Sequence, residues 1–535
     1  MHARGISPVV GLILLMLIVI ILGSFVALLP KDLVEKAKPA PVTALDVEVY
    51  RDAVVVKHAS GDPFNIRFAK VKVTMPNRIS FMKPFLENWL SRDVMMEIGD
   101  EKALMYNECT FFRPFDYGEV EVFWKDKIMY RVAKSTINEY YSPSFLRSYS
   151  STLGVDSVLG VIADENSIVA TACNYPDDPP GLIMFLDELG NVNKAYQGRY
   201  NYSGLHDLPL RDVAKAPSGY LAVGSDRYDY GYVLKVDNSG NLQWVKYYGR
   251  GYHGIHNISS ISCSGDVCAI VGKYSGHIRI ALIDSNDGNY TSKITSLDLK
   301  GTPDRVIKVD DGWLVVGRTF SALFDNNLNP VFVKYYTDVR VIRNGVEVKN
   351  GYILTGSANN DILVMRIDKN GNVLWAKIYN CGDREEGYSI YCDKSSEICT
   401  VVGHSRINGY YRLVVLKVDG VNGQLFDYKV YGFGNKHAYF DVVKPVYDKL
   451  GRFRGFVGGG RIGNDPMIVR INVEGEIWGC GSRLMNVKFS ESSFKPSARD
   501  QSGFISVSPD PPNDNTPPNL PTVSLTSHGI CLCYR

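Results

Sequence analysis

A repeating hairpin pattern between about residues 150 and 480 constrains the fold more than any other feature. In each copy a strand ends in Asp or Asn, a turn containing Gly follows, and the next strand often carries an aromatic residue, Lys and Tyr. The clearest copies are VLKVDNSGNLQWVKYYG at 233–249 and LVMRIDKNGNVLWAKIYN at 363–380. The turns recur about 41 to 53 residues apart, the spacing of four-stranded propeller blades. Seven residues anchor them: Asp187, Asp237, Asp284, Asp325, Asp368, Asp419 and Asn472.

An upstream half-repeat supports the same architecture. Residues 219–224 (GYLAVG), 312–317 (GWLVVG) and 351–356 (GYILTG) match one another and predict the inner hairpin of a blade. Glycine at both ends permits a sharp turn and close backbone approach. Seven anchors predict seven blades, because a blade cannot bury both of its faces without neighbours. A row of Ig-like sandwiches is the alternative, but units of this length are too short for it.

The ends of the propeller, predicted at 143–485, indicate how the ring closes. Residues 144–149 (SFLRSY) have the form of an outer strand such as 244–248 (WVKYY), yet they precede the first full unit. The last unit, near Cys480, lacks the Lys-x-Tyr ending. We therefore predict that the early strand completes the last blade.

The first thirty residues predict a compartment. Residues 9–29 (VVGLILLMLIVIILGSFVALL) contain no charge and are long enough to span a bilayer as a helix. The prediction is a single-pass protein of the cell membrane, with its C-terminus outside the cell. A cleaved secretory signal is the alternative; its apolar core is usually shorter and ends at an A-x-A-like site.

The residues before this span carry a resemblance. Arg4-Gly5-Ile6 followed by SPVVG resembles the start of archaeal type IV pilin precursors. The resemblance implies that a prepilin peptidase cuts between Gly5 and Ile6. It implies a leader at 1–5 and a helix at 6–38 that packs with other pilin subunits in a filament. A plain signal anchor remains the alternative.

Residues 40–140 extend the resemblance. Val47 and Val49, then Val54 and Val56, follow the period of two expected for strands. The interruption at 58–63 (HASGDP) is similar to a turn in the small β-sandwich that follows archaeal pilin helices. The fold class is therefore mainly β: an N-terminal transmembrane helix, a small β-sandwich and a seven-bladed propeller. Residues 486–535 form a C-terminal segment with a Pro-rich tail, and after about residue 505 we expect a stalk or a disordered tail.

Two cysteine pairs occupy the same place in different repeats. Cys263 and Cys268, like Cys392 and Cys399, flank a hairpin turn, so cross-strand disulfides are expected. Metal ligation is the alternative, but a zinc site usually needs a second pair beside the first. The pairing of the remaining six stays open: Cys109, Cys173, Cys381, Cys480, Cys531 and Cys533.

Catalytic motifs are not found, and no cofactor is predicted. Lys and Arg number 59 against 57 Asp and Glu, which gives no reason to expect nucleic acid as a partner. The D-x-x-G-N turns lack the further ligands of a calcium loop. Aromatic runs at 227–232 and 409–411 could bind a glycan or a partner, or could pack between blades. Glycosylation sequons begin at Asn201, Asn257 and Asn289.

The resulting hypothesis is a pilin-like surface subunit, in or at the tip of a type IV pilus-like filament, that displays a propeller for adhesion, or for binding a partner or a glycan. The membrane, the prepilin peptidase and other subunits are its implied partners. One alternative is an enzyme, because quinone-dependent dehydrogenases loosely resemble these repeats. The other is an anchored sensor or scaffold that never enters a filament.

Overall fold

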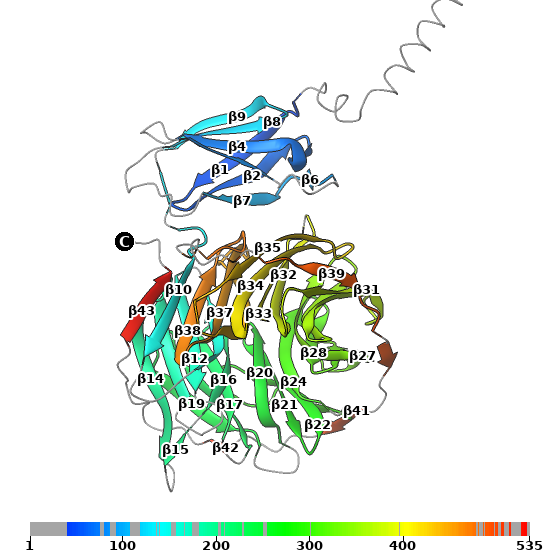
Figure 1. The fold of residues 1–535 in the computed structure, drawn as a ribbon. Helices are drawn as coiled ribbons and strands as arrows, with labels where there is room; N and C mark the ends of the chain where they lie inside the picture. The colour runs from blue at the N-terminus through cyan, green and yellow to red at the C-terminus, as the bar shows by residue number, and fades with distance from the viewer. Residues whose placement is uncertain are drawn as a thin grey trace, which may run out of the picture. The chain divides into compact units, whose positions relative to one another are not determined.

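The structure is a computed structural model that describes residues 40–535 apart from short gaps. These residues form two units (Figure 1). The first extends to residue 137, without 50–53 and 105–113, which belong with residues 138–535 in the second. The gaps are 75–79, 86–92, 107–117, 135, 139, 151–156, 165, 174–180, 202–204, 208, 227–228, 250–253, 300, 395, 478–479, 481–484, 486, 497, 501–503, 508–512, 515–525 and 532–535.

The first unit consists of antiparallel sheets. Its elements are β1 (Thr43–Val49), β2 (Ala53–Gly61), β3 (Phe64–Asn65), a 3-10 turn (Ile66–Phe68), β4 (Ala69–Thr74), β5 (Ser80–Pro84), β6 (Met95–Met96), β7 (Glu101–Met105), β8 (Gly118–Trp124) and β9 (Lys127–Lys134). The sheets run β1–β2–β7, β5–β4–β8–β9 and β3–β6. Along β1, Val47 and Val49 are buried whereas Asp46 is exposed, as the period of two requires. The predicted turn at 58–63 is shorter than expected, because β2 continues to Gly61, where φ is +101°.

The second unit is a β-propeller in which, among the described residues, seven sheets surround one axis (Figure 1). We letter the four strands of each blade A to D from the axis outward, since the A strands of adjacent blades contact one another. The A–B and C–D turns lie at one end of the ring, the A–B end; the B–C turns lie at the other, the B–C end. Blades 1 to 3 are β11 (Ser157–Ala163), β12 (Ser167–Cys173), β13 (Gly181–Asp187) and β14 (Val192–Asn201), extended by β15 (Leu205–Asp207); β16 (Leu210–Ala216), β17 (Gly219–Ser225), β18 (Gly231–Val236) and β19 (Leu242–Tyr247); and β20 (His256–Ser264), β21 (Val267–Tyr274), β22 (His277–Asp284) and β23 (Ile294–Leu297). Blades 4 to 7 are β24 (Pro303–Val309), β25 (Gly312–Gly317), β26 (Phe320–Phe324) and β27 (Pro330–Tyr336); β28 (Val339–Val348), β29 (Gly351–Ala358), β30 (Asp361–Ile367) and β31 (Val373–Asn380); β32 (Glu385–Cys392), β33 (Ile398–Ile407), β34 (Tyr410–Asp419) and β35 (Leu425–Tyr431); and β36 (Ala438–Tyr447), β37 (Phe453–Ile462), β38 (Asp465–Ile471) and β10 (Phe145–Ser150).

The two glycines of the repeated hairpin motif each permit a close backbone contact. Gly312 begins strand B with φ +145°, and a Cβ there would lie 2.0 Å from the carbonyl oxygen of Phe324. Gly317 ends the motif facing strand A, where a Cβ would lie 2.5 Å from the carbonyl oxygen of Thr302. At this level strand A bulges, and a register irregularity recurs in the A strand of all seven blades. The motif therefore shapes the wall of the axis.

The C–D turns lock adjacent blades together. Asp237 Oδ1 accepts hydrogen bonds of 2.8 Å from the backbone N–H groups of Ser239 and Asn241, so a turn, not a calcium loop, uses this carboxylate. The Tyr at the end of strand D donates its hydroxyl to the glycine carbonyl of the next blade's turn, as from Tyr248 to Gly288 at 2.5 Å. The equivalent hydrogen bonds join Tyr149 to Gly190, Tyr336 to Gly371 and Tyr379 to Gly423.

Ring closure follows the prediction. β10 pairs antiparallel with β38, with Phe145 opposite Arg470 and Ser148 opposite Met467. The outer strand of blade 7 therefore comes from the start of the propeller sequence, and the prediction is confirmed. Closure by a distant strand makes the last blade depend on both ends of the ring.

The C-terminal segment wraps around the propeller, so the expectation of a free stalk is wrong for its described strands. Strand D of a blade presents an unpaired edge, and the segment adds a fifth strand to that edge in blades 5, 4, 3, 2 and 7. None of the seven prolines of residues 486–535 falls within these described strands, as expected because proline cannot donate a ladder hydrogen bond. The strands are β39 (Ser490–Ser493) on β31, β40 (Ala498–Asp500) on β27, β41 (Phe504–Val507) on β23, β42 (Asn513–Asp514) on β19 and β43 (Thr526–Cys531) on β10.

The predicted location, single-pass in the cell membrane with an exterior C-terminus, is corrected. The part of the chain that the structure describes holds no helix long and apolar enough to cross a bilayer. The leader at 1–5, the helix at 6–38 and the apolar run at 9–29, from which that location was inferred, lie outside the described residues. The cleavage residues Arg4, Gly5 and Ile6 lie there too.

Candidate functional site

The bulges of the seven A strands bring a varied set of side chains to the axis, near the B–C end. A bulge places two successive residues of one strand opposite a single residue of the partner strand. The side chains of these two residues then depart from the regular alternation between the two faces of the sheet. Hydrophobic cores fill the space between blades, so these positions are where blades differ in chemistry. The residue pairs are Leu159 and Gly160, Arg211 and Asp212, Ser259 and Ser260, Asp304 and Arg305, Arg343 and Asn344, Tyr388 and Ser389, and Asp441 and Val442.

Asp212 of blade 2 centres the first charged network at the axis. Lys444 of blade 7 lies 2.5 Å and Arg305 of blade 4 lies 3.1 Å from its carboxylate. Ser260 of blade 3 donates its hydroxyl at 2.8 Å. Burial raises the pKa of Asp212, but attraction to Lys444 and Arg305 outweighs it, and the pKa is lowered overall. The buried carboxylate thus ties four blades together while remaining charged.

Arg343 of blade 5 centres the second network. Its guanidinium pairs with Asp304 of blade 4 at 2.5 Å and with Glu386 of blade 6. Burial raises the pKa of Asp304 although Arg343 opposes it. Asn344 donates to the Ser389 hydroxyl at 3.1 Å, which joins blades 5 and 6 again. Among the described residues, these ion pairs neutralise the charges of Asp212 and Arg343 inside the ring.

A run of aromatic rings leads from the second network to the surface at blades 6 and 7. Arg343 lies 5.2 Å from the ring centre of Tyr388, which lies 5.1 Å from His404. His404 contacts Tyr411 at 4.9 Å and Tyr439 at 5.9 Å, and those two rings lie 5.5 Å apart. The tyrosines are half-buried, whereas His404 is buried. We call Tyr388, His404, Tyr410, Tyr411, His437 and Tyr439 the aromatic cluster.

His404 is held uncharged within this cluster. Burial lowers the pKa of His404 to about 4; attraction to Glu386 opposes the shift, and repulsion from Arg343 adds to it. At neutral pH the ring therefore packs as an aromatic group and not as a cation.

The outer part of the aromatic cluster is capped by arginines. Tyr410 lies 5.3 Å and Tyr411 lies 5.7 Å from His437. Arg412 lies 5.2 Å over Tyr410, and Arg461 lies 4.7 Å over Tyr439. Half-buried tyrosines held by arginines form a preorganised surface, because few rotamers remain to be fixed on binding.

A shallow cavity lies elsewhere, at the A–B end between blades 3 and 4. Its volume is about 450 Å³, and it is lined by turn residues that include Thr295, Asn327 and Asn329. Lys293 is its one ionisable lining residue. It contains no aromatic ring, so the aromatic cluster is the better candidate for recognition.

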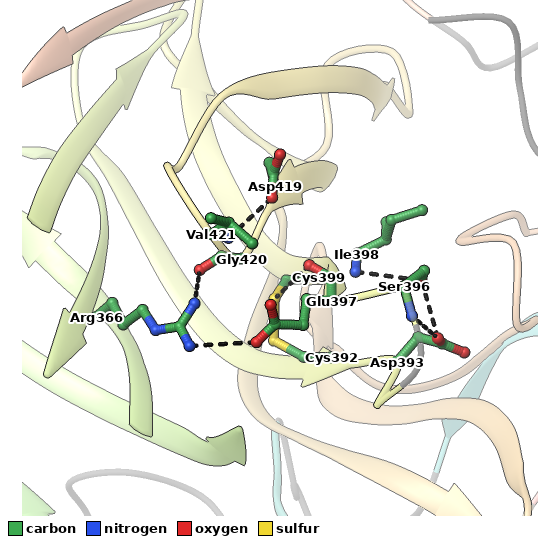
Figure 2. The surroundings of a disulfide bond; sticks show 10 residues. All are labelled: Arg366, Cys392, Asp393, Ser396, Glu397, Ile398, Cys399, Asp419, Gly420 and Val421. Carbon is green, nitrogen blue, oxygen red and sulfur yellow. Dashed lines mark hydrogen bonds and ion pairs between the residues drawn. A yellow bond between two sulfur atoms is a disulfide. The ribbon is translucent and has the colours of Figure 1, made fainter. Parts of the chain in front are cut away.

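The structure brings together both predicted cysteine pairs. Cys263 is disulfide-bonded to Cys268, and Cys392 to Cys399, each across the A–B turn of its blade. Figure 2 shows the second bond beside Arg366 of blade 5, which donates to Gly420 O at 2.8 Å and pairs with Glu397 at 3.2 Å. The pairs thus stabilise hairpins at the end opposite the aromatic cluster.

The remaining predicted residues are dispersed. Asn257 lies half-buried at the start of β20, and exposed Asn289 lies in a C–D turn, where its amide donates to Asp287 at 2.7 Å. Asn201 ends β14. Glycosylation at these three stays a prediction. Cys480 is disulfide-bonded, and Cys381 contacts the Ser405 hydroxyl at 3.4 Å.

The axial residues were missed by sequence reasoning, although a signal for them exists. Asp212, Arg305 and Asn344 each lie seven residues before the first glycine of a hairpin motif. Only the bulge explains why that position faces the axis. His404 and His437 had no such signal, because their contacts join two blades.

Comparisons with known proteins give only distant structural similarity. No protein-family model matches the chain, and no curated protein is similar to it in sequence. Among solved structures, the chain is similar to the RRP9 WD40 repeats, with 10% identity, a TM-score of 0.45, and coverage of 62% of this chain and 98% of that one. The WD40 domain of Neurospora crassa Pan2 gives 10% identity and a TM-score of 0.41 over 59% and 89%. That of Toxoplasma gondii coronin gives 10% and 0.42 over 63% and 90%. Similarity this distant says nothing about a shared function, and none of these comparisons supports the pilin resemblance.

Proposed function

We propose that this protein is a binding scaffold, not an enzyme, and that its propeller holds a protein or peptide partner at the aromatic cluster. The observation that carries the proposal is the continuous run of half-buried rings from Tyr388 to Tyr439. Tyrosine and arginine are the residue types that contribute most to protein interfaces. The filament role implied by the pilin-like start stays a prediction, since it rests on residues outside the described part.

The rigidity of the site supports a binding role. Arg343 of blade 5 lies 5.2 Å from the ring centre of Tyr388 and pairs with Glu386 of blade 6. This inter-blade ion pair restricts the position of the Tyr388 ring. The backbone N–H of Tyr411 donates to His437 Nδ1 at 3.2 Å, which joins blade 6 to the strand entering blade 7. A surface that is already ordered loses little entropy on binding.

Selection of peptides tests the proposal. A displayed library of random twelve-residue peptides is panned against the full chain, and selected peptides are measured against Tyr411→Ala/Tyr439→Ala. Tyr274→Ala is the matched control, because Tyr274 has the same neighbours, with His256 at 4.8 Å and Arg279 at 4.3 Å, in blade 3. We expect binding to be lost in the double variant and kept in the control. Peptides that bind both variants equally, or a library that enriches nothing, would refute the site.

A further inference from the structure

Several cations elsewhere in the propeller form ion pairs, unlike four cations around the aromatic cluster. Lys369 pairs with both Asp311 and Glu347 at 2.6 Å, and Arg366 pairs with Glu397 at 3.2 Å. At the B–C end of blades 6 and 7, by contrast, four positive side chains have no carboxylate partner among the described residues. These are Arg384, Arg406, Arg412 and Lys436.

The unpaired cations lie close together. The backbone N–H of Arg406 donates to Arg384 O at 2.8 Å, which places these two residues side by side. Arg412 donates to Lys436 O at 3.3 Å, which ties the second pair together. Arg384, Arg406 and Lys436 are exposed, as is His437. Because His437 Nδ1 accepts the Tyr411 N–H, the proton of a neutral ring lies on Nε2, which is then a further donor.

Two nearby glutamates are engaged inward, and exposed Asp383, next to Arg384, forms no ion pair with these cations among the described residues. Glu385 is buried and accepts from Cys381 N at 2.6 Å and from the Ser405 hydroxyl at 3.0 Å. Glu386 is buried and pairs with Arg343. The whole chain has a formal charge of only +2, so the local excess of positive charge is a property of this face.

The arrangement of rings and guanidinium groups identifies the partner chemistry. Arg384 and Arg406 are exposed, and the planar N–H edge of a guanidinium group forms two parallel hydrogen bonds with a carboxylate. Tyr411 is tilted by 50° to His437 and by 63° to Tyr439, so the rings offer no flat platform for a sugar.

We propose that this face binds an acidic peptide segment, whose Asp or Glu side chains pair with Arg384, Arg406 and Lys436 while an apolar side chain contacts the tyrosines. The inference rests on the proposed function and specifies its partner. Carboxylates on a flexible segment suit cations spread over several loops, because each side chain can reach its own partner.

A pair of labelled peptides tests this charge selectivity by fluorescence anisotropy with the full chain. One carries a Phe flanked by four Glu on each side, and the other replaces every Glu by Gln. We expect the Glu peptide to bind and to weaken as salt rises. Arg406→Gln/Lys436→Gln should weaken binding roughly twofold to thirtyfold, as expected for two exposed ion pairs. Lys349→Gln/Lys394→Gln, which removes the same charge from exposed positions at the A–B end of blades 5 and 6, should leave it unchanged.

Three results would overturn the inference. The Glu peptide does not bind, or the Gln peptide binds as well, or both double variants weaken binding equally. Binding of heparin in place of the Glu peptide, with the same variant dependence, would assign the face to an anionic polysaccharide instead. If the peptides selected from the random library are neutral or basic but still need Tyr411 and Tyr439, the charge inference fails while the proposed function stands. If no selected peptide needs these tyrosines, both fail.

Discussion

Replacing Asp212 tests the network that holds the propeller axis together. In Asp212→Asn the volume stays the same, but Lys444 and Arg305 lose their shared carboxylate. Removing one partner of a buried ion pair typically costs about 3–5 kcal/mol, because the remaining charge stays desolvated. We therefore expect the free energy of unfolding to fall by about 3–5 kcal/mol, measured by urea denaturation at pH 7.

Lys444→Met should cost less, about 2 kcal/mol, because Asp212 keeps Arg305 and the Ser260 hydroxyl. The double variant should be more stable than the sum of the two losses predicts, since Lys444 is no longer left beside a neutral amide. Asp311→Asn is the control, because Asp311 forms an exposed pair with Lys369 that should contribute less than about 1 kcal/mol.

The pH dependence of the free energy of unfolding provides a second test of the Asp212 network. The folded-state pKa of Asp212 is lowered, so its stabilising contribution is full above the unfolded-state pKa and is lost as pH falls through the folded value. Wild type should therefore lose stability below about pH 4 more steeply than Asp212→Asn. A cost below about 1 kcal/mol, or equal acid slopes, would refute the network as a stabilising feature.

Three further changes probe the rest of the molecule. Tyr379→Phe removes the hydroxyl that donates to Gly423 O, and we expect a loss of about 1–2 kcal/mol in thermal unfolding; an unchanged midpoint would contradict the inter-blade lock. Burial raises the pKa of Asp52 to about 6, although the backbone N–H groups of Tyr141 and Ser142 donate to its carboxylate. The free energy of unfolding of wild type should therefore fall by on the order of 3 kcal/mol as pH rises from 3.8 to 6. Asp52→Asn should lack this loss when unfolding at pH 4 and pH 7 is compared. Truncation after residue 489 removes every fifth strand laid down by the C-terminal segment, and the exposed edges should cause self-association in size-exclusion chromatography; a monomeric truncated protein would count against their protective role.

Local sequence pattern was enough to predict most of the propeller. The seven anchors, the paired glycines and the early strand at 144–149 are each a short-range signal, and the structure uses them as turns, close backbone contacts and ring closure. The wrapping of the C-terminal segment could not be read in the same way, because β39 to β43 are short and gain their partners from distant blades.

The candidate site was predictable only in fragments. The run at 409–411 stood out as aromatic, but its contact with His437 depends on the packing of blade 6 against blade 7. Asp212 and Arg305 share a position seven residues before a hairpin motif, but nothing in the sequence indicates that they meet each other and Lys444 of a third blade. Contacts made across the ring axis depend on blade number and closure, which local pattern does not encode.

Hydrogen–deuterium exchange of the full chain, with and without a saturating amount of the Glu-flanked peptide, tests the central claim most directly. The aromatic cluster and its cations lie on segments 404–412 and 434–440, and exposed backbone there should exchange more slowly when a partner covers it. We predict protection of these two segments and no change at 392–399 or 263–268 on the opposite end. Protection confined to the A–B end, or none at any segment despite saturation, would contradict the account.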